Sequence, residues 1–132
     1  MNLTQLHPPL LKKINNPTNK VNKQLDQQFL ERFINLIAEN IQEQLSIDSV
    51  SKQLFISRSQ LHRKIKALTG LSPSQFIRNY RLDCSMELLK KGPIKISQVA
   101  SEVGFSDEKY FSRRFKERFG FSPSEVAIEN RY

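Results

Sequence analysis

The heptapeptide GLSPSQF at Gly70–Phe76 recurs in nearly the same form, GFSPSEV, at Gly120–Val126. The apolar positions ahead of the two copies also correspond: Leu61 with Phe111, and Ile65 with Phe115. Self-similarity at a fixed period indicates a repeated supersecondary unit. Two unrelated amphipathic helix pairs would share apolar spacing, but they would not share the Gly-x-Ser-Pro-Ser ending. The sequence therefore predicts two copies of one unit.

Each copy combines a short helix, a turn and a longer helix. In the first copy, Ser46 and Ser57 can cap the two helices, because a serine hydroxyl accepts from the free N–H groups of a first helical turn. In the second copy, VASEVGF at Val99–Phe105 places the small Ala100 inside the first helix and a glycine in the turn. A short helix followed by a turn and a basic helix is the layout of a helix-turn-helix, whose second helix enters the DNA major groove.

The turn of the first copy contains Phe55 where the second copy has Gly104. Phenylalanine is poorly suited to this position if the backbone there is left-handed. We therefore expect the first turn either to take a different backbone conformation or to bear strain.

A helix turns by about 100° per residue, and this divides the second helix of each copy into two faces. In the first copy the core face carries Leu61, Ile65 and Leu68. The opposite face carries hydrogen-bonding and basic residues in both copies: Ser59, His62, Arg63 and Lys66 in the first, and Lys109, Ser112, Arg113 and Lys116 in the second. Arginine can bind a guanine edge through two hydrogen bonds, so Arg63 and Arg113 are the first candidates for base readout. Lys66 and Lys116 are expected to touch phosphates.

The net charge of +8, from 21 Lys and Arg against 13 Asp and Glu, suits a polyanionic partner. Charge alone does not separate DNA, RNA and anionic lipid. A single helix with a charged face usually exposes that face to solvent without binding a partner. Because the basic face recurs in two helix-turn-helix units, we favour a binding face. RNA modules stack bases on exposed aromatic residues, whereas the phenylalanines here fall at core spacing. An adaptor that binds only proteins is the remaining alternative to a DNA-binding function.

Catalysis and metal binding have little support in the sequence. The single cysteine, Cys84, excludes an internal disulfide, and two distant histidines offer no metal-ligand pair, so no cofactor is expected. A Gly-rich phosphate loop and a Ser/His/Asp or Cys/His constellation are also missing, which argues against an enzyme. Cys84 lies off the apolar stripe of its predicted helix, and we expect an inert thiol at a helix contact rather than a redox sensor.

The chain divides into an arm and one all-α domain. Residues 1–24, which contain three prolines and four lysines without an acid, are predicted to be a flexible basic linker or tail. The domain, residues 25–132, is expected to begin with an amphipathic helix from Asp26 whose apolar face includes Phe33 and Ile41. Its further parts are a first helix-turn-helix unit at about 47–70, a linker helix at about 73–91 and a second unit at about 96–120. No apolar run could span a bilayer, so we expect a soluble cytoplasmic protein without membrane contact.

The stretches SRSQLHRKIKALTG at Ser57–Gly70 and ISQVASEVGFSDEKYFSRRFKERFGFSPSE at Ile96–Glu125 carry a specific family signature. From about Ile47 to Val126 the chain resembles the DNA-binding domain of AraC/XylS-type bacterial transcription regulators. The resemblance implies two homeodomain-like helix-turn-helix subdomains joined by a long linker helix, the architecture that the internal repeat predicts independently. It also implies binding to two successive major-groove segments of promoter DNA, so that one chain recognises an asymmetric site.

The resemblance assigns contacts to individual positions. Base contacts are expected from Ser59, His62, Arg63, Lys109, Ser112 and Arg113. Phosphate contacts are expected from Ser57, Arg58, Lys66, Arg81 and Lys116. Arg81 matches a linker-helix arginine that in the family helps to hold the two units or touches a phosphate, and a salt-bridged structural arginine is equally open. The acids Asp107 and Glu108 suit a helix N-terminus but would repel phosphates, so the first unit is expected to supply more affinity and the second to tune site choice.

The resemblance further implies an activator that meets RNA polymerase. The segment from Leu25 to Asp48 is similar to the helix that leads into this domain in response regulators and hybrid two-component sensors. The chain is therefore expected to be either a free-standing small regulator or the output end of a longer protein with an upstream receiver or sensor domain as a partner.

Overall fold

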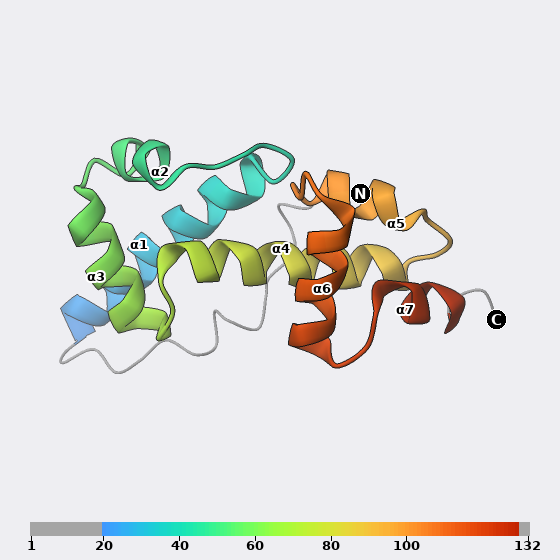
Figure 1. The fold of residues 1–132 in the computed structure, drawn as a ribbon. Coiled ribbons are helices and arrows are strands. Elements are labelled where there is room, and N and C mark those ends of the chain that lie inside the picture. Colours follow the sequence, from blue (N-terminus) through green and yellow to red (C-terminus); the bar gives the residue numbers. More distant parts are fainter. Residues whose placement is uncertain (1–19, 130–132) are drawn as a thin grey trace. The chain divides into compact units, whose positions relative to one another are not determined.

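The computed structural model describes residues 20–129, and the side chains of residues 23–127, as a helical protein without strands (Figure 1). The helices are α1 (Lys20–Glu39), α2 (Ile47–Gln53), α3 (Arg58–Thr69), α4 (Pro73–Lys90), α5 (Ile96–Glu102), α6 (Glu108–Phe119) and α7 (Pro123–Glu129). The all-α class predicted from the sequence is confirmed. None of the helices in this range is long and apolar enough to cross a membrane.

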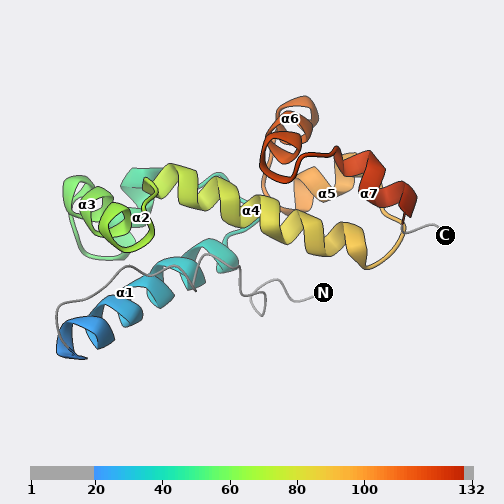
Figure 2. The same cartoon turned by 90° about the horizontal axis from the view of Figure 1, so that it is seen from below.

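The helices form two compact units. The first contains α1, α2, α3 and the start of α4 up to Arg78, and in it α3 packs against α1 and α2 (Figure 2). The second contains the segment Ile41–Gln44, the rest of α4 from Asn79, and α5 to α7, with α6 packed against α5 and α7. Each unit therefore holds one short-helix, turn, long-helix pair and a part of α4.

Helix α1 begins at Lys20, earlier than the sequence predicted. Residues 20–24 are helical rather than part of a flexible tail, because no proline or glycine interrupts the chain between Lys20 and Glu39. The remainder of the predicted tail, residues 1–19, lies outside the described residues. The helix ends at Glu39, so the buried Ile41 follows the helix and belongs to the second unit instead of extending the apolar face of α1.

The ends of α3 are fixed by local hydrogen bonds. The Ser57 hydroxyl accepts from the Gln60 backbone N–H at 3.1 Å, and the Gln60 side chain accepts from the Ser57 N–H at 3.0 Å. This reciprocal capping box satisfies two donors that a helix N-terminus leaves free. At the other end, Gly70 is left-handed with φ 79° and its N–H donates to the Lys66 carbonyl at 2.8 Å. The predicted caps at Ser46 and Ser57 are thus confirmed.

The two long helices bury different side chains. In α3 the predicted core residues Leu61, Ile65 and Leu68 are all buried. In α6, Phe111 and Phe115 are fully buried and Phe119 is half-buried, with the Phe115 and Phe119 rings 4.6 Å apart. The second unit therefore has an aromatic core where the first has an aliphatic one, and both leave the opposite helix face to solvent.

Helix α4 is buried on more than one face. Cys84 lies off the main apolar stripe of this helix and is only 1% exposed. This burial agrees with the inert thiol at a helix contact that the sequence predicted. Burial raises the pKa of the Cys84 thiol to about 12, which keeps it protonated and unreactive near neutral pH.

The side chain of Arg81 is the main polar element inside the second unit. It is 6% exposed, and its guanidinium donates to the carbonyls of Ile41 at 2.6 Å, Val103 at 2.8 Å and Glu43 at 2.7 Å. Burial lowers the pKa of Arg81, but an arginine remains protonated in proteins. The predicted phosphate contact of Arg81 is wrong, because the residue is buried and three of its five N–H donors bind backbone carbonyls. The structural alternative is the one that the geometry supports.

We predict that Arg81→Met lowers the free energy of unfolding by about 3 kcal/mol, because it leaves buried carbonyls without donors. Lys90→Met is the matched control, since it removes an exposed cation from the same helix. Urea denaturation followed by circular dichroism measures the difference. Equal midpoints for Arg81→Met and the parent protein would contradict this account of the network.

The turn after α2 has the same backbone as the turn after α5. Phe55 has φ 59° and Gly104 has φ 91°, and both lie in the left-handed region. Each turn closes with two backbone hydrogen bonds. In the first turn the Phe55 N–H donates to the Lys52 carbonyl and the Ile56 N–H to the Ser51 carbonyl. In the second the Gly104 N–H donates to the Ser101 carbonyl and the Phe105 N–H to the Ala100 carbonyl. This is the Schellman pattern of helix termination. Of the two outcomes expected from the sequence, strain at Phe55 is therefore the one that occurs.

We predict that Phe55→Gly stabilises the protein by about 0.5–1 kcal/mol. The left-handed conformation costs a residue with a Cβ about 1–2 kcal/mol, and the greater freedom of glycine in the unfolded chain offsets part of that gain. The converse change, Gly104→Ala, should be strongly destabilising, because a Cβ there would meet the Arg81 guanidinium and the Ile41 carbonyl. Thermal melts of the two variants measure both effects, and a lower melting temperature for Phe55→Gly would refute the strain.

Candidate nucleic-acid interface

Helix α3 presents one exposed polar face. Ser59, His62 and Arg63 are exposed, as is Lys66 one turn further on, and all four lie opposite the buried Leu61–Ile65–Leu68 face. The capping box and the terminal Gly70 fix where this helix begins and ends. The sequence therefore placed these residues on the correct face, and their side chains are free to approach a partner of the first unit.

Two cations at the edges of this face already have partners. The Arg58 Nε lies 3.3 Å from an Asp48 carboxylate oxygen, and the Lys66 Nζ donates to the Gly70 carbonyl at 2.9 Å. Both members of the Arg58–Asp48 pair are well exposed, and exposed ion pairs contribute little to stability. Arg58 can therefore exchange Asp48 for another anion at small cost. Ser57 uses its hydroxyl oxygen as an acceptor in the helix cap, which leaves its O–H free to donate.

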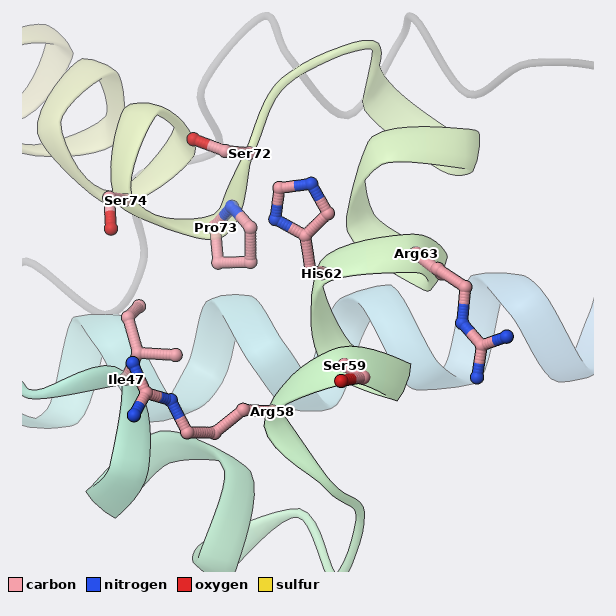
Figure 3. Close-up of a pocket in the computed structure, with 8 residues that line it drawn as sticks. All are labelled: Ile47, Arg58, Ser59, His62, Arg63, Ser72, Pro73 and Ser74. Atoms are coloured by element: carbon pink, nitrogen blue, oxygen red, sulfur yellow. The ribbon is translucent and has the colours of Figure 1, made fainter.

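An open groove of about 460 Å³ lies between α3 and the start of α4 (Figure 3). The imidazole of His62 extends from α3 toward Ser72 and Pro73, Arg58 extends toward Ile47, and Arg63 points away from the groove floor. Its lining joins predicted residues with others: Ile47, Arg58, Ser59, His62, Arg63, Ser72, Pro73 and Ser74. The groove thus has an apolar floor and a rim of hydroxyl, imidazole and guanidinium groups.

The sequence analysis did not assign Ser72 and Ser74 to the candidate interface. Both belong to the repeated Ser-Pro-Ser motif, which was used only to recognise the duplication. The Ser72 hydroxyl accepts from the Gln75 N–H at 3.2 Å, so Ser72 caps α4. Its nearness to His62 depends on the chain reversal after Gly70, which the motif alone does not reveal.

Helix α6 presents the corresponding face of the second unit. Lys109, Arg113 and Lys116 are exposed, and Ser112 is half-buried. The guanidinium carbon of Arg113 lies 5.4 Å from the centre of the Tyr110 ring, a cation–π distance that restrains the side chain. The four residues predicted from the repeat therefore share one face here too.

The remaining arginines of α6 are engaged within the protein. Arg114 pairs with Glu117 at 3.1 Å, and hydrogen bonding to Tyr110 raises its pKa. Arg118 forms a two-point pair with Asp83 at 2.8 and 2.9 Å. The cations with the fewest protein contacts on α6 are thus those on the predicted face.

The acid at the start of α6 has a structural partner. One Asp107 carboxylate oxygen accepts from the Lys109 N–H at 2.8 Å and from the Tyr110 N–H at 3.2 Å. An anion at a helix N-terminus is stabilised by the free N–H groups there. The first residues of α6 are therefore more negative than those of α3, whose cap is the neutral pair of Ser57 and Gln60.

Known proteins share this arrangement of two helix-turn-helix units. The sequence profile of a helix-turn-helix domain family matches residues 50–127. A solved transcriptional regulator from Chromobacterium violaceum, described as having an AraC-type DNA-binding domain, superposes with a TM-score of 0.74 at 30% identity and covers 81% of this chain and 96% of its own. The chain belongs to the AraC-type helix-turn-helix family. The resemblance noted in the sequence is thereby confirmed.

This chain also matches parts of much longer curated proteins. Histidine kinase P4 of Formosa agariphila is 38% identical over 109 residues, which is 82% of this chain and 8% of that protein. The HTH-type transcriptional regulator MtrA of Neisseria gonorrhoeae is 34% identical over 100 residues, which is 76% of this chain and 33% of that protein. The chain thus spans a third or less of the length of these two relatives.

Proposed function

We propose that this chain binds a specific site on double-stranded promoter DNA and so regulates transcription. Helices α3 and α6 each enter one major-groove segment, and together the two units read an asymmetric site. The main observation behind the proposal is that both helices bury an apolar face and present hydrogen-bonding and basic side chains on the other. A recognition helix has this division, because it must be anchored by one face while the other reads base edges.

In this proposal the base contacts come from the middle of each exposed face. Arg63 and Arg113 bind guanine through O6 and N7, a pairing in which the planar guanidinium supplies two donors. Around them, hydroxyl, imidazole and ammonium groups reach neighbouring base edges: Ser59 and His62 from α3, and Lys109 and Ser112 from α6. Cation–π contact with Tyr110 supports the role of Arg113, since a restrained side chain loses less freedom on binding.

The phosphate contacts come from the borders of the two faces. In the first unit Ser57, Arg58 and Lys66 fill this role, and in the second unit Lys116 does so. Arg58 is suited to it because its exposed pairing with Asp48 is easily exchanged. The groove beside Ser72 and Ser74 offers further hydroxyl donors to the same DNA strand.

Further partners follow from the family and from one relative. Activation through RNA polymerase is the mode that the AraC/XylS resemblance implies. A sensor or receiver domain preceding α1 is supported by the similarity to a histidine kinase. The proposed site of action is the bacterial cytoplasm, where promoter DNA is found, and no catalytic step is part of the proposal.

We predict that Arg63→Ala and Arg113→Ala each weaken binding to the preferred duplex by about tenfold or more, with loss of preference at a different base position. Lys64→Ala is the matched control, because it also removes one positive charge from α3. The Lys64 ammonium lies 4.8 Å from the centre of the Phe29 ring, on another side of the helix. The preferred duplex is obtained by selection from a random pool, and affinities are measured by fluorescence anisotropy at fixed salt. Equal losses for Arg63→Ala and Lys64→Ala would leave only a nonspecific basic surface.

We also predict a steep fall of affinity with salt, because each phosphate contact releases condensed counterions. Lys66→Gln and Lys116→Gln should each reduce the slope of log affinity against log salt by about one. Arg81→Lys should leave that slope unchanged, since Arg81 is buried within the second unit. A smaller slope for Arg81→Lys would show that Arg81 contacts phosphate. An affinity of the parent protein that does not change with salt would contradict DNA binding.

A further inference from the structure

The most exposed large apolar side chain among residues 23–127 is Phe55, at 87%. It is also the one residue in that range with a side chain and a positive φ. A phenylalanine in this position combines two unfavourable features, a left-handed backbone and an apolar ring in water. Such an outlier points to a contact with a binding partner, because the exposed ring does not stabilise the folded protein.

The fold itself does not need a phenylalanine here. The turn after α5 closes with the same pair of backbone hydrogen bonds and has Gly104 at the equivalent position. In the second unit glycine is required, because a Cβ would meet the Arg81 guanidinium. In the first unit the ring projects into solvent instead. Glycine would therefore complete the first turn with less strain, and the ring is the part that requires an explanation.

The position of Phe55 suggests which partner the ring meets. It precedes Ser57, the N-cap of α3, by two residues, and the N-terminal part of a recognition helix is the part that contacts base edges. The exposed cations Lys52 and Arg58 flank it on either side in the sequence. The acid nearest in this region, Asp48, is paired with Arg58. Phe55 is thus flanked in the sequence by two exposed cations, and the pair that Arg58 forms is exposed and easily exchanged, so this stretch suits a polyanion better than an apolar protein surface.

We propose that Phe55 is an apolar DNA contact, whose ring packs against a thymine 5-methyl group or a deoxyribose at the edge of the groove segment read by α3. This inference rests on the proposed function and adds a residue to it. The thymine methyl is the apolar feature of the major groove, and phenylalanine is among the side chains that recognise it. Because Gly104 offers no equivalent, the contact distinguishes the half-site of the first unit from that of the second.

The first experiment separates the effect of the Phe55 ring on binding from the effect of the strained backbone at this position. Phe55→Gly and Phe55→Asn both accept a positive φ and remove the ring, whereas Phe55→Tyr keeps it. On the selected duplex we expect Phe55→Gly and Phe55→Asn to bind about fivefold or more weakly, and Phe55→Tyr to bind like the parent protein. Leu25→Ser, which removes another exposed apolar side chain, at 58%, is the control and should bind normally. Unchanged affinity of the glycine and asparagine variants would overturn the proposal.

The second experiment observes the position directly. The protein has no tryptophan, so Phe55→Trp introduces a single fluorescent reporter. Addition of the selected duplex should shift its emission to shorter wavelength or quench it, while the emission of Leu25→Trp should stay constant. Replacing thymines by uracil one at a time then separates the two chemical sources: a loss at one position assigns the methyl group, and no loss at any position assigns the deoxyribose.

The outcomes distinguish this contact from the function on which it rests. A tryptophan emission that does not change, while anisotropy of a labelled duplex shows binding, would exclude contact of position 55 with DNA and favour a protein partner for the ring. Failure of the parent protein to enrich any duplex would instead overturn the proposed function, and this contact with it.

Discussion

The contact of the Arg81 guanidinium with three backbone carbonyls is the interaction on which the second unit depends. It joins residues from the segment after α1, from α4 and from the end of α5, which are far apart in the sequence. Buried carbonyl groups require donors, and one guanidinium supplies all three of these carbonyls at once. The same contact dictates Gly104, since any side chain there would displace the guanidinium. The requirement for glycine in the turn that leads into α6 therefore follows from one buried cation.

The two units hold their long basic helices, α3 and α6, with different side chains. In the first, an aliphatic face and a neutral capping box hold α3. In the second, a row of phenylalanine rings and a charged Asp107 cap hold α6. Both solutions leave a basic face outward, yet the electrostatic character at the beginning of the two helices differs. The repeat thus preserves the geometry of the basic helix while the residues on its outward face differ between the copies, a difference that the proposed reading of an asymmetric site requires.

Much of this arrangement could be predicted from the sequence because it depends on neighbouring residues. The caps at Ser46 and Ser57 and the outward positions of Arg63 and Arg113 follow from contacts within a turn or two of helix. The prediction that failed concerns contacts between distant parts of the chain. Arg81 was expected to contact phosphate, but its guanidinium donates to the carbonyls of Ile41 and Val103, and no local pattern in the sequence reveals these partners.

The sequence by itself determined the all-α class, the duplication and the basic faces of α3 and α6, because helical periodicity and capping are local properties of the chain. It left open whether the first turn would avoid or accept a left-handed phenylalanine. Only the tertiary structure decided this, since the closing hydrogen bonds of that turn fix the backbone of Phe55 and the packing of α2 against α3 leaves its ring in solvent. It likewise brought Ser72 and Ser74 beside His62 and buried Arg81, because such placements arise from the packing of distant segments and not from any residue's immediate neighbours.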